Sequence, residues 1–81
     1  MGRFYFHLRH GDELVSDEEG QDLPDVSDAL REALLAAREL LAEAIRAGND
    51  QIPDVVVIAD EAGREVDRIP LAEVLPKPLK A

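Results

Sequence analysis

The fold of this chain is decided by residues 25–47, DVSDALREALLAARELLAEAIRA, the one stretch long and periodic enough to cover a core by itself. Its apolar residues recur at spacings of three and four, which places them on a single stripe of a helix. They are Val26, Leu30, Ala33, Leu34, Ala37, Leu40, Leu41, Ala44 and Ile45. The pattern predicts one long amphipathic helix whose apolar stripe is buried.

The sequence marks both ends of this helix. Asp25 follows Pro24, and its carboxylate can accept hydrogen bonds from the free N–H groups of the first turn. Gly48 and Asn49 tolerate the left-handed conformation that ends helices. The helix is therefore expected to begin at Asp25 and to end before Gly48.

The opposite face of the helix is charged and is expected to lie in water. It carries Asp28, Arg31, Glu32, Arg38, Glu39, Glu43 and Arg46. Leu35 falls among these charges and is the exception. It is either a lone exposed leucine, which is common on protein surfaces, or a contact point for a partner.

The segment before the helix predicts a β-hairpin. Residues 3–9 alternate, with Phe4, Phe6 and Leu8 on one side and Arg3, Tyr5, His7 and Arg9 on the other. Residues 10–12 form a turn, residues 13–16 a short return strand, and residues 17–20 a second turn. One face of this hairpin is thus expected to pack on the helix.

The segment after the helix predicts two more strands. Residues 55–58 are Val-Val-Val-Ile, and an unbroken apolar run is typical of a central strand covered on both faces. A turn at 60–63 leads to an antiparallel partner at 64–69, and Pro70 can begin a short helix through residue 75. Residues 1–76 are then a single domain, and residues 77–81 are expected to fray.

These elements predict an α+β two-layer sandwich in ββαββ order. An antiparallel sheet of three or four strands would carry one long helix on one face, with a short C-terminal helix after the last strand. The outer face would show Tyr5, His7 and Arg9 together with two of the four aliphatic residues at 55–58. Residues 70–81 or a second copy could cover that face, and the sequence favours a homodimer through it.

Composition excludes several classes of partner. Eighteen acidic and nine basic residues give a net charge of −9, which repels nucleic acids and anionic membrane surfaces. The chain has no cysteine and no apolar run near the ~18 residues of a membrane span, so a cytoplasmic location is expected. Six acids and no base lie between residues 17 and 28. This run is a solvated loop, a surface for a basic partner, or a weak cation site.

Known catalytic and cofactor patterns are absent from the sequence. None of the five glycines belongs to a phosphate-binding loop, and the acids at 17, 18, 19 and 22 do not have calcium-loop spacing. His7 and His10 lack a third metal ligand at a familiar distance, and the hydroxyls are limited to Ser16, Ser27 and one tyrosine. We therefore expect no metal, no cofactor, no catalytic residues and no enzymatic activity.

Tyr5, His7 and Arg9 form the one polar cluster that could bind something. Alternation puts them on one sheet face within reach of one another, and a histidine there titrates near neutral pH. The cluster is either a solvated strand face or a surface for a ligand or partner.

Several short motifs resemble one known family. The order is Phe4-Tyr5-Phe6-His7-Leu8-Arg9, Gly11-Asp12, Asp17-Glu18-Glu19-Gly20 and Leu23-Pro24-Asp25, followed by an alanine-rich helix. This order resembles a small bacterial domain-of-unknown-function family over nearly the whole chain. The resemblance implies one small domain and brings no substrate, cofactor or catalytic residue with it.

Two functions are consistent with these observations. The first is a small acidic interaction or regulatory module, without catalysis, that masks a basic protein partner. The alternative is a small-ligand sensor that uses the Tyr5, His7 and Arg9 face, in which Arg9 would pair with a carboxylate or phosphate.

Overall fold

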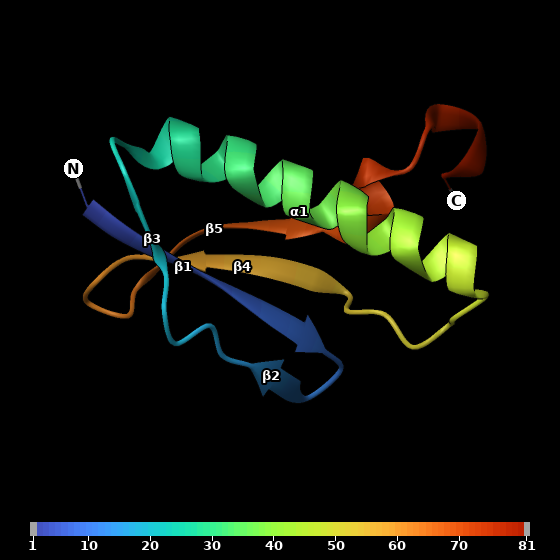
Figure 1. Cartoon of the computed structure of the whole chain (residues 1–81), viewed down its shortest axis with the longest axis horizontal. Helices are drawn as coiled ribbons and strands as arrows, with labels where there is room; N and C mark the ends of the chain where they lie inside the picture. The colour runs from blue at the N-terminus through green and yellow to red at the C-terminus, as the bar shows by residue number, and fades with distance from the viewer. Residues whose placement is uncertain (1, 81) are drawn as a thin grey trace.

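The computed structural model describes residues 2–80 and shows one long helix lying across an antiparallel sheet (Figure 1). The elements are β1 (Gly2–His10), β2 (Glu13–Val15), β3 (Gln21–Leu23), α1 (Val26–Ala47), β4 (Val55–Ala59), β5 (Glu65–Pro70) and the 3-10 turns η1 (Leu71–Val74) and η2 (Lys77–Leu79). The predicted α+β fold class is confirmed. The short helix expected after Pro70 is the 3-10 turn η1.

The sheet has the strand order β2-β1-β4-β5, and β3 also pairs with β1. All neighbours are antiparallel: β2 pairs with the last three residues of β1, and β3 pairs with its first three. The sequence predicted three or four strands, and β3 is the fifth. It was missed because Gln21–Leu23 has a single apolar residue and no alternation, so only its pairing with Gly2–Phe4 makes it a strand.

The two ends of α1 form as predicted. Asp25 has an extended backbone, and its carboxylate accepts the N–H of Asp28 at 3.0 Å. Gly48 closes the helix in the left-handed conformation, with φ of 63°. These caps satisfy backbone groups that a helix end leaves without partners.

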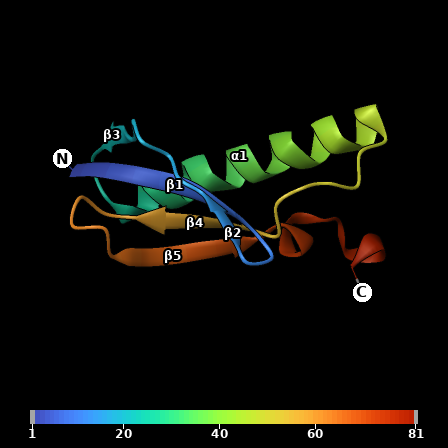
Figure 2. The same ribbon diagram turned by 90° about the horizontal axis from the view of Figure 1, so that it is seen from below.

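The core lies between α1 and the sheet, and the fully buried residues on its helix side are all alanines, with leucines of α1 packed around them. Ala29, Ala33 and Ala37 are fully buried against a group that includes Val56 and Ile58 of β4. The predicted stripe holds in the middle of the helix and is wrong at its ends, since Val26 and Ile45 are 42% and 72% exposed. Figure 2 gives the reason for Ile45: α1 lies close to the sheet near its N-terminus and rises away from it toward its C-terminus.

The outer face of the sheet differs from the expectation. Val57 and Ala59 point outward but are only 5% and 3% exposed. In the register, Val57 lies between His7 and Arg68, whose long side chains flank it. The predicted exposure of two aliphatic residues between 55 and 58 is therefore wrong for Val57.

The segment that follows β5 does not cover this outer face. η1 packs against α1, and its Leu71 is buried in the core on the helix side of the sheet. Residues 70–81 were one of the two covers expected for the outer face. Their first part, η1, lies on the other side of the sheet and does not cover it. Within residues 2–80, no helix is both long and apolar enough to pass through a bilayer.

Candidate functional site

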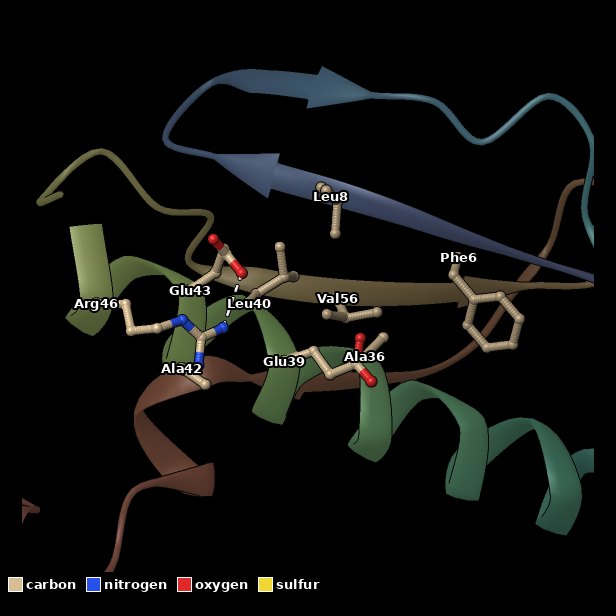
Figure 3. A pocket seen from close by; sticks show the side chains of 9 residues that line it. All are labelled: Phe6, Leu8, Ala36, Glu39, Leu40, Ala42, Glu43, Arg46 and Val56. Atoms are coloured by element: carbon tan, nitrogen blue, oxygen red, sulfur yellow. Dashed lines mark hydrogen bonds and ion pairs between the residues drawn. The ribbon is translucent and has the colours of Figure 1, made fainter.

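A groove of about 700 Å³ opens between α1 and the β1 side of the sheet (Figure 3). It is lined by Phe6, Leu8, Ala36, Glu39, Leu40, Ala42, Glu43, Arg46 and Val56. It lies where the C-terminal half of α1 has risen away from the strands. The groove is therefore the space left between two layers that diverge.

The floor of the groove is apolar because β1 alternates. Phe6 and Leu8 point to the helix side, and Val56 of β4 is paired with Leu8 in the register. Leu40 enters from the helix, and Figure 3 shows it facing Leu8 and Val56 across the groove. Val15 of β2 is paired with Leu8, shares its face of the sheet, and is 63% exposed. It extends the apolar floor toward the edge of the hairpin.

The rim of the groove on the helix side is acidic. The flank of α1 that carries the lining residues Glu39 and Glu43 also carries Glu32 and Asp28, at helical spacing. Glu43 is paired with Arg46 at 2.8 Å. Within residues 2–80, neither Glu32 nor Glu39 forms an ion pair. Two carboxylates on this flank are thus available to a basic group.

Leu35 lies on this acidic flank, four residues before Glu39. Its side chain is 46% exposed and does not line the groove. The sequence placed it among charges, and the structure puts it beside the acidic rim.

Tyr5, His7 and Arg9 lie together on the outer face, on the opposite side of the sheet from the groove. The rings of Tyr5 and His7 are stacked with centroids 6.3 Å apart and an angle of 14° between their planes. His7 accepts the N–H of Asp17 on Nδ1 at 2.9 Å, so its neutral form carries the proton on Nε2. Arg9 is close enough to Glu65 to contribute to the lowered pKa of that carboxyl, which is due first to Arg68.

Asp17 has a structural role that the sequence did not reveal. Its carboxylate accepts the N–H of Phe6 at 3.1 Å and those of Glu19 and Gly20 at 3.2 Å. Partial burial by itself would raise its pKa, but these hydrogen bonds and the nearby His7 hold the pKa below its ordinary value. Asp17 thus fills the gap between β2 and β3 beside β1, and it is not part of a solvated loop.

The free edge of β5 is closed to a further strand. Leu71 donates its N–H to the carbonyl of Asp54, which precedes β4. Because N–H groups alternate in direction along a strand, the backbone positions of Arg68 and Pro70 are directed to the free edge of the sheet. The N–H of Arg68 donates to its neighbour Asp67 at 2.7 Å, and Pro70 has no N–H to offer. Strand addition at this edge is therefore disfavoured at these two positions.

Within residues 2–80, no three or more histidine, aspartate or glutamate side chains form a group able to hold a metal ion. The sequence assigned the groove residues of the sheet and Leu40 to a buried core and the charged groove residues of the helix to a solvated face, and it assigned Ala36 and Ala42 to neither. The sequence signal for the groove was weak, since leucines occur along the whole stripe and only the last fully buried alanine, Ala37, marks where close packing ends.

Comparison with known proteins identifies a family and nothing closer. A family model described as Domain of unknown function (DUF6894) matches residues 3–72. The chain therefore belongs to this family, which confirms the resemblance to a domain of unknown function. No curated protein and no solved structure matches the chain.

Proposed function

We propose that this member of the family is a small protein-interaction module that binds a basic, apolar segment of another protein in the groove between α1 and β1. The observation that carries the proposal is an open apolar floor beside carboxylates that have no ion-pair partner within residues 2–80. Apolar surface of this kind mostly marks an interaction site in soluble proteins. No catalytic step is part of the proposal.

The dimensions of the groove favour a helical segment as the partner. Its helix wall runs from Ala36 to Arg46, which corresponds to about 15 Å along the axis. A partner helix of about three turns would match this length, with apolar residues at helical spacing inserted toward Phe6, Leu8 and Leu40. Lysines or arginines beside those residues would meet Glu32 and Glu39.

The homodimer through the outer sheet face has less physical support. The homodimer was expected because two aliphatic residues between 55 and 58 would be exposed, and one of them, Val57, is covered within the single chain. Pairing at that face would instead have to remove Tyr5, His7 and Arg68 from water. Burying such polar groups costs free energy unless each finds a new partner.

The test uses a fluorescently labelled peptide of about 14 residues, with leucines at helical spacing and lysines elsewhere. Fluorescence anisotropy would measure its binding at low and high salt. Ala36→Leu fills the groove and Glu39→Lys reverses a rim charge. Each is expected to weaken binding about tenfold, and high salt should weaken it for the unaltered protein.

The matched control is Glu73→Lys, which makes the same charge change on exposed η1, away from the groove. It should leave the affinity within about twofold, because η1 lies on the other side of α1 from the groove and a partner held in the groove does not touch it. No binding by the unaltered protein, or an equal loss in the control, would contradict the proposal.

A further inference from the structure

The chain itself carries one basic and apolar turn, residues 77–80, which we call the lysine turn. Lys77 and Lys80 are the only lysines of the protein, and Leu79 between them is 66% exposed. The turn is held by hydrogen bonds from the N–H of Leu79 to the carbonyl of Pro76 at 2.9 Å and from that of Lys80 to Lys77 at 3.2 Å. The exposed leucine and its flanking charges are thus presented in a formed turn.

The lysine turn has the chemistry that the groove accepts. Within residues 2–80, neither of its lysines forms an ion pair, and neither Glu32 nor Glu39 does. One leucine could enter the apolar floor while two lysines approach the acidic rim. The lysine turn is thus a positively charged segment in a chain whose net charge is −9.

The lysine turn cannot reach the groove of its own chain. The groove lies on the β1 side of α1, whereas η1 and the residues after it lie on the other side (Figure 1). Leu75 lines a second, smaller hollow there together with Leu41 and Ile45. The four residues from Leu75 to Leu79 span at most about 14 Å, and half the circumference of a helix 10–12 Å across is about 17 Å. The turn could therefore enter this groove only in a second copy.

We propose that the lysine turn of one copy occupies the groove of a second copy, forming a reversible dimer that competes with the external partner. The proposal rests on the groove assigned under the proposed function. In a two-fold symmetric pair each copy donates its turn to the other, so two small contacts act together. Because each contact is small, the dimer is weak and depends on protein concentration.

The test measures the solution mass of the full chain by light scattering behind size exclusion, at several protein concentrations and two salt levels. The unaltered protein should shift toward a dimer as its concentration rises, and the second salt level separates the lysine–glutamate attraction from the repulsion between two chains of net charge −9, which salt also screens. Leu79→Ala should weaken dimerisation about fivefold or more. The control Leu14→Ala shortens another exposed leucine, on the outer face beside Arg9, and should have no effect.

A charge exchange makes the test specific. Glu39→Lys or Lys80→Glu alone should weaken the dimer, and the two together should restore it, because the pair is rebuilt with opposite signs. In the peptide assay, Leu79→Ala should bind the labelled peptide more tightly, since the competing turn is gone.

A monomer at every concentration would overturn the proposal. So would a dimer that Leu79→Ala and Lys80→Glu leave unchanged, which would instead indicate the outer sheet face as the interface. If the peptide binds in the groove while the protein stays monomeric, the proposed function stands and the self-docking fails. If neither occurs, both fail.

Discussion

The two ends of the helix–sheet interface are built from the same stripe of α1 and behave differently. At the N-terminal end, Ala29, Ala33 and Ala37 are fully buried, and Phe4 beneath them is 7% exposed. At the C-terminal end, Leu40 and Leu41 are only partly buried and Ile45 is 72% exposed. The alanines let the helix approach the sheet closely, while Leu30 and Leu34 beside them are partly buried, as Leu40 and Leu41 are at the other end.

We assign different roles to the two ends of the interface: the closed end stabilises the fold, and the open end is available for binding a partner. The closed end has no room for a partner, and it is fastened further by β3, which pairs with β1 and contacts α1. The open end leaves Phe6, Leu8 and Val15 incompletely covered. Apolar area left in water adds little to folding but remains available to a partner.

The largest effect should come from adding volume to each end of the stripe. Ala33→Leu forces a larger side chain into a fully buried site and should lower the free energy of unfolding by about 3 kcal/mol. Ala36→Leu enters the groove and should change it by less than about 0.5 kcal/mol. Urea unfolding followed by circular dichroism measures both. Equal losses would show that the groove is as tightly packed as the core.

Replacing one glycine at each end should give the next largest contrast. Gly20 has φ of 70°, and a Cβ there would lie 2.9 Å from the carbonyl oxygen of Phe4. Gly48 has φ of 63° and no atom within 4 Å of such a Cβ. Gly20→Ala should therefore cost about 2 kcal/mol and Gly48→Ala about 1 kcal/mol, since only the first adds overlap to backbone strain. Thermal melts of the two variants measure this difference. A lower melting temperature for Gly48→Ala than for Gly20→Ala would show that the backbone around Gly20 can shift to accept a Cβ.

Removing the carboxylate of Asp17, at the boundary between the two ends, should have a smaller effect than Ala33→Leu or Gly20→Ala. Asp17→Ala loses three backbone hydrogen bonds at a partly buried site and should cost about 1 to 1.5 kcal/mol at neutral pH. The exposed neighbour Glu18 provides the matched control, and Glu18→Ala should change little.

The pH dependence of the Asp17 effect has a definite sign. The pKa of Asp17 is lower in the folded chain than in the unfolded chain. Its contribution to stability is therefore complete above the unfolded pKa of about 4 and is lost as the pH falls through the folded value. The difference between the unaltered protein and Asp17→Ala should shrink below about pH 4. A difference that stays constant down to pH 2 would assign the loss to packing instead of charge.

Local signals predicted most of the elements correctly. Asp25 and Gly48 cap the helix, the alternation of residues 3–9 forms β1, and the run at 55–58 lies in the central strand β4. Each of these depends on neighbours in the sequence, through periodicity or the conformations a residue tolerates. β3 and the role of Asp17 were missed because both depend on β1 being beside them.

By itself, the sequence determined the layers of this protein: one amphipathic helix with defined ends, a hairpin before it, two strands after it, and an acidic surface. Periodicity, caps and charge are properties of short segments, so they can be read in order along the chain. Only the tertiary structure decided the angle at which α1 leaves the sheet, the cover over Val57, and the side of the helix on which residues 77–80 lie. These follow from how side chains of different sizes pack across distances of many residues, and the groove exists because of them.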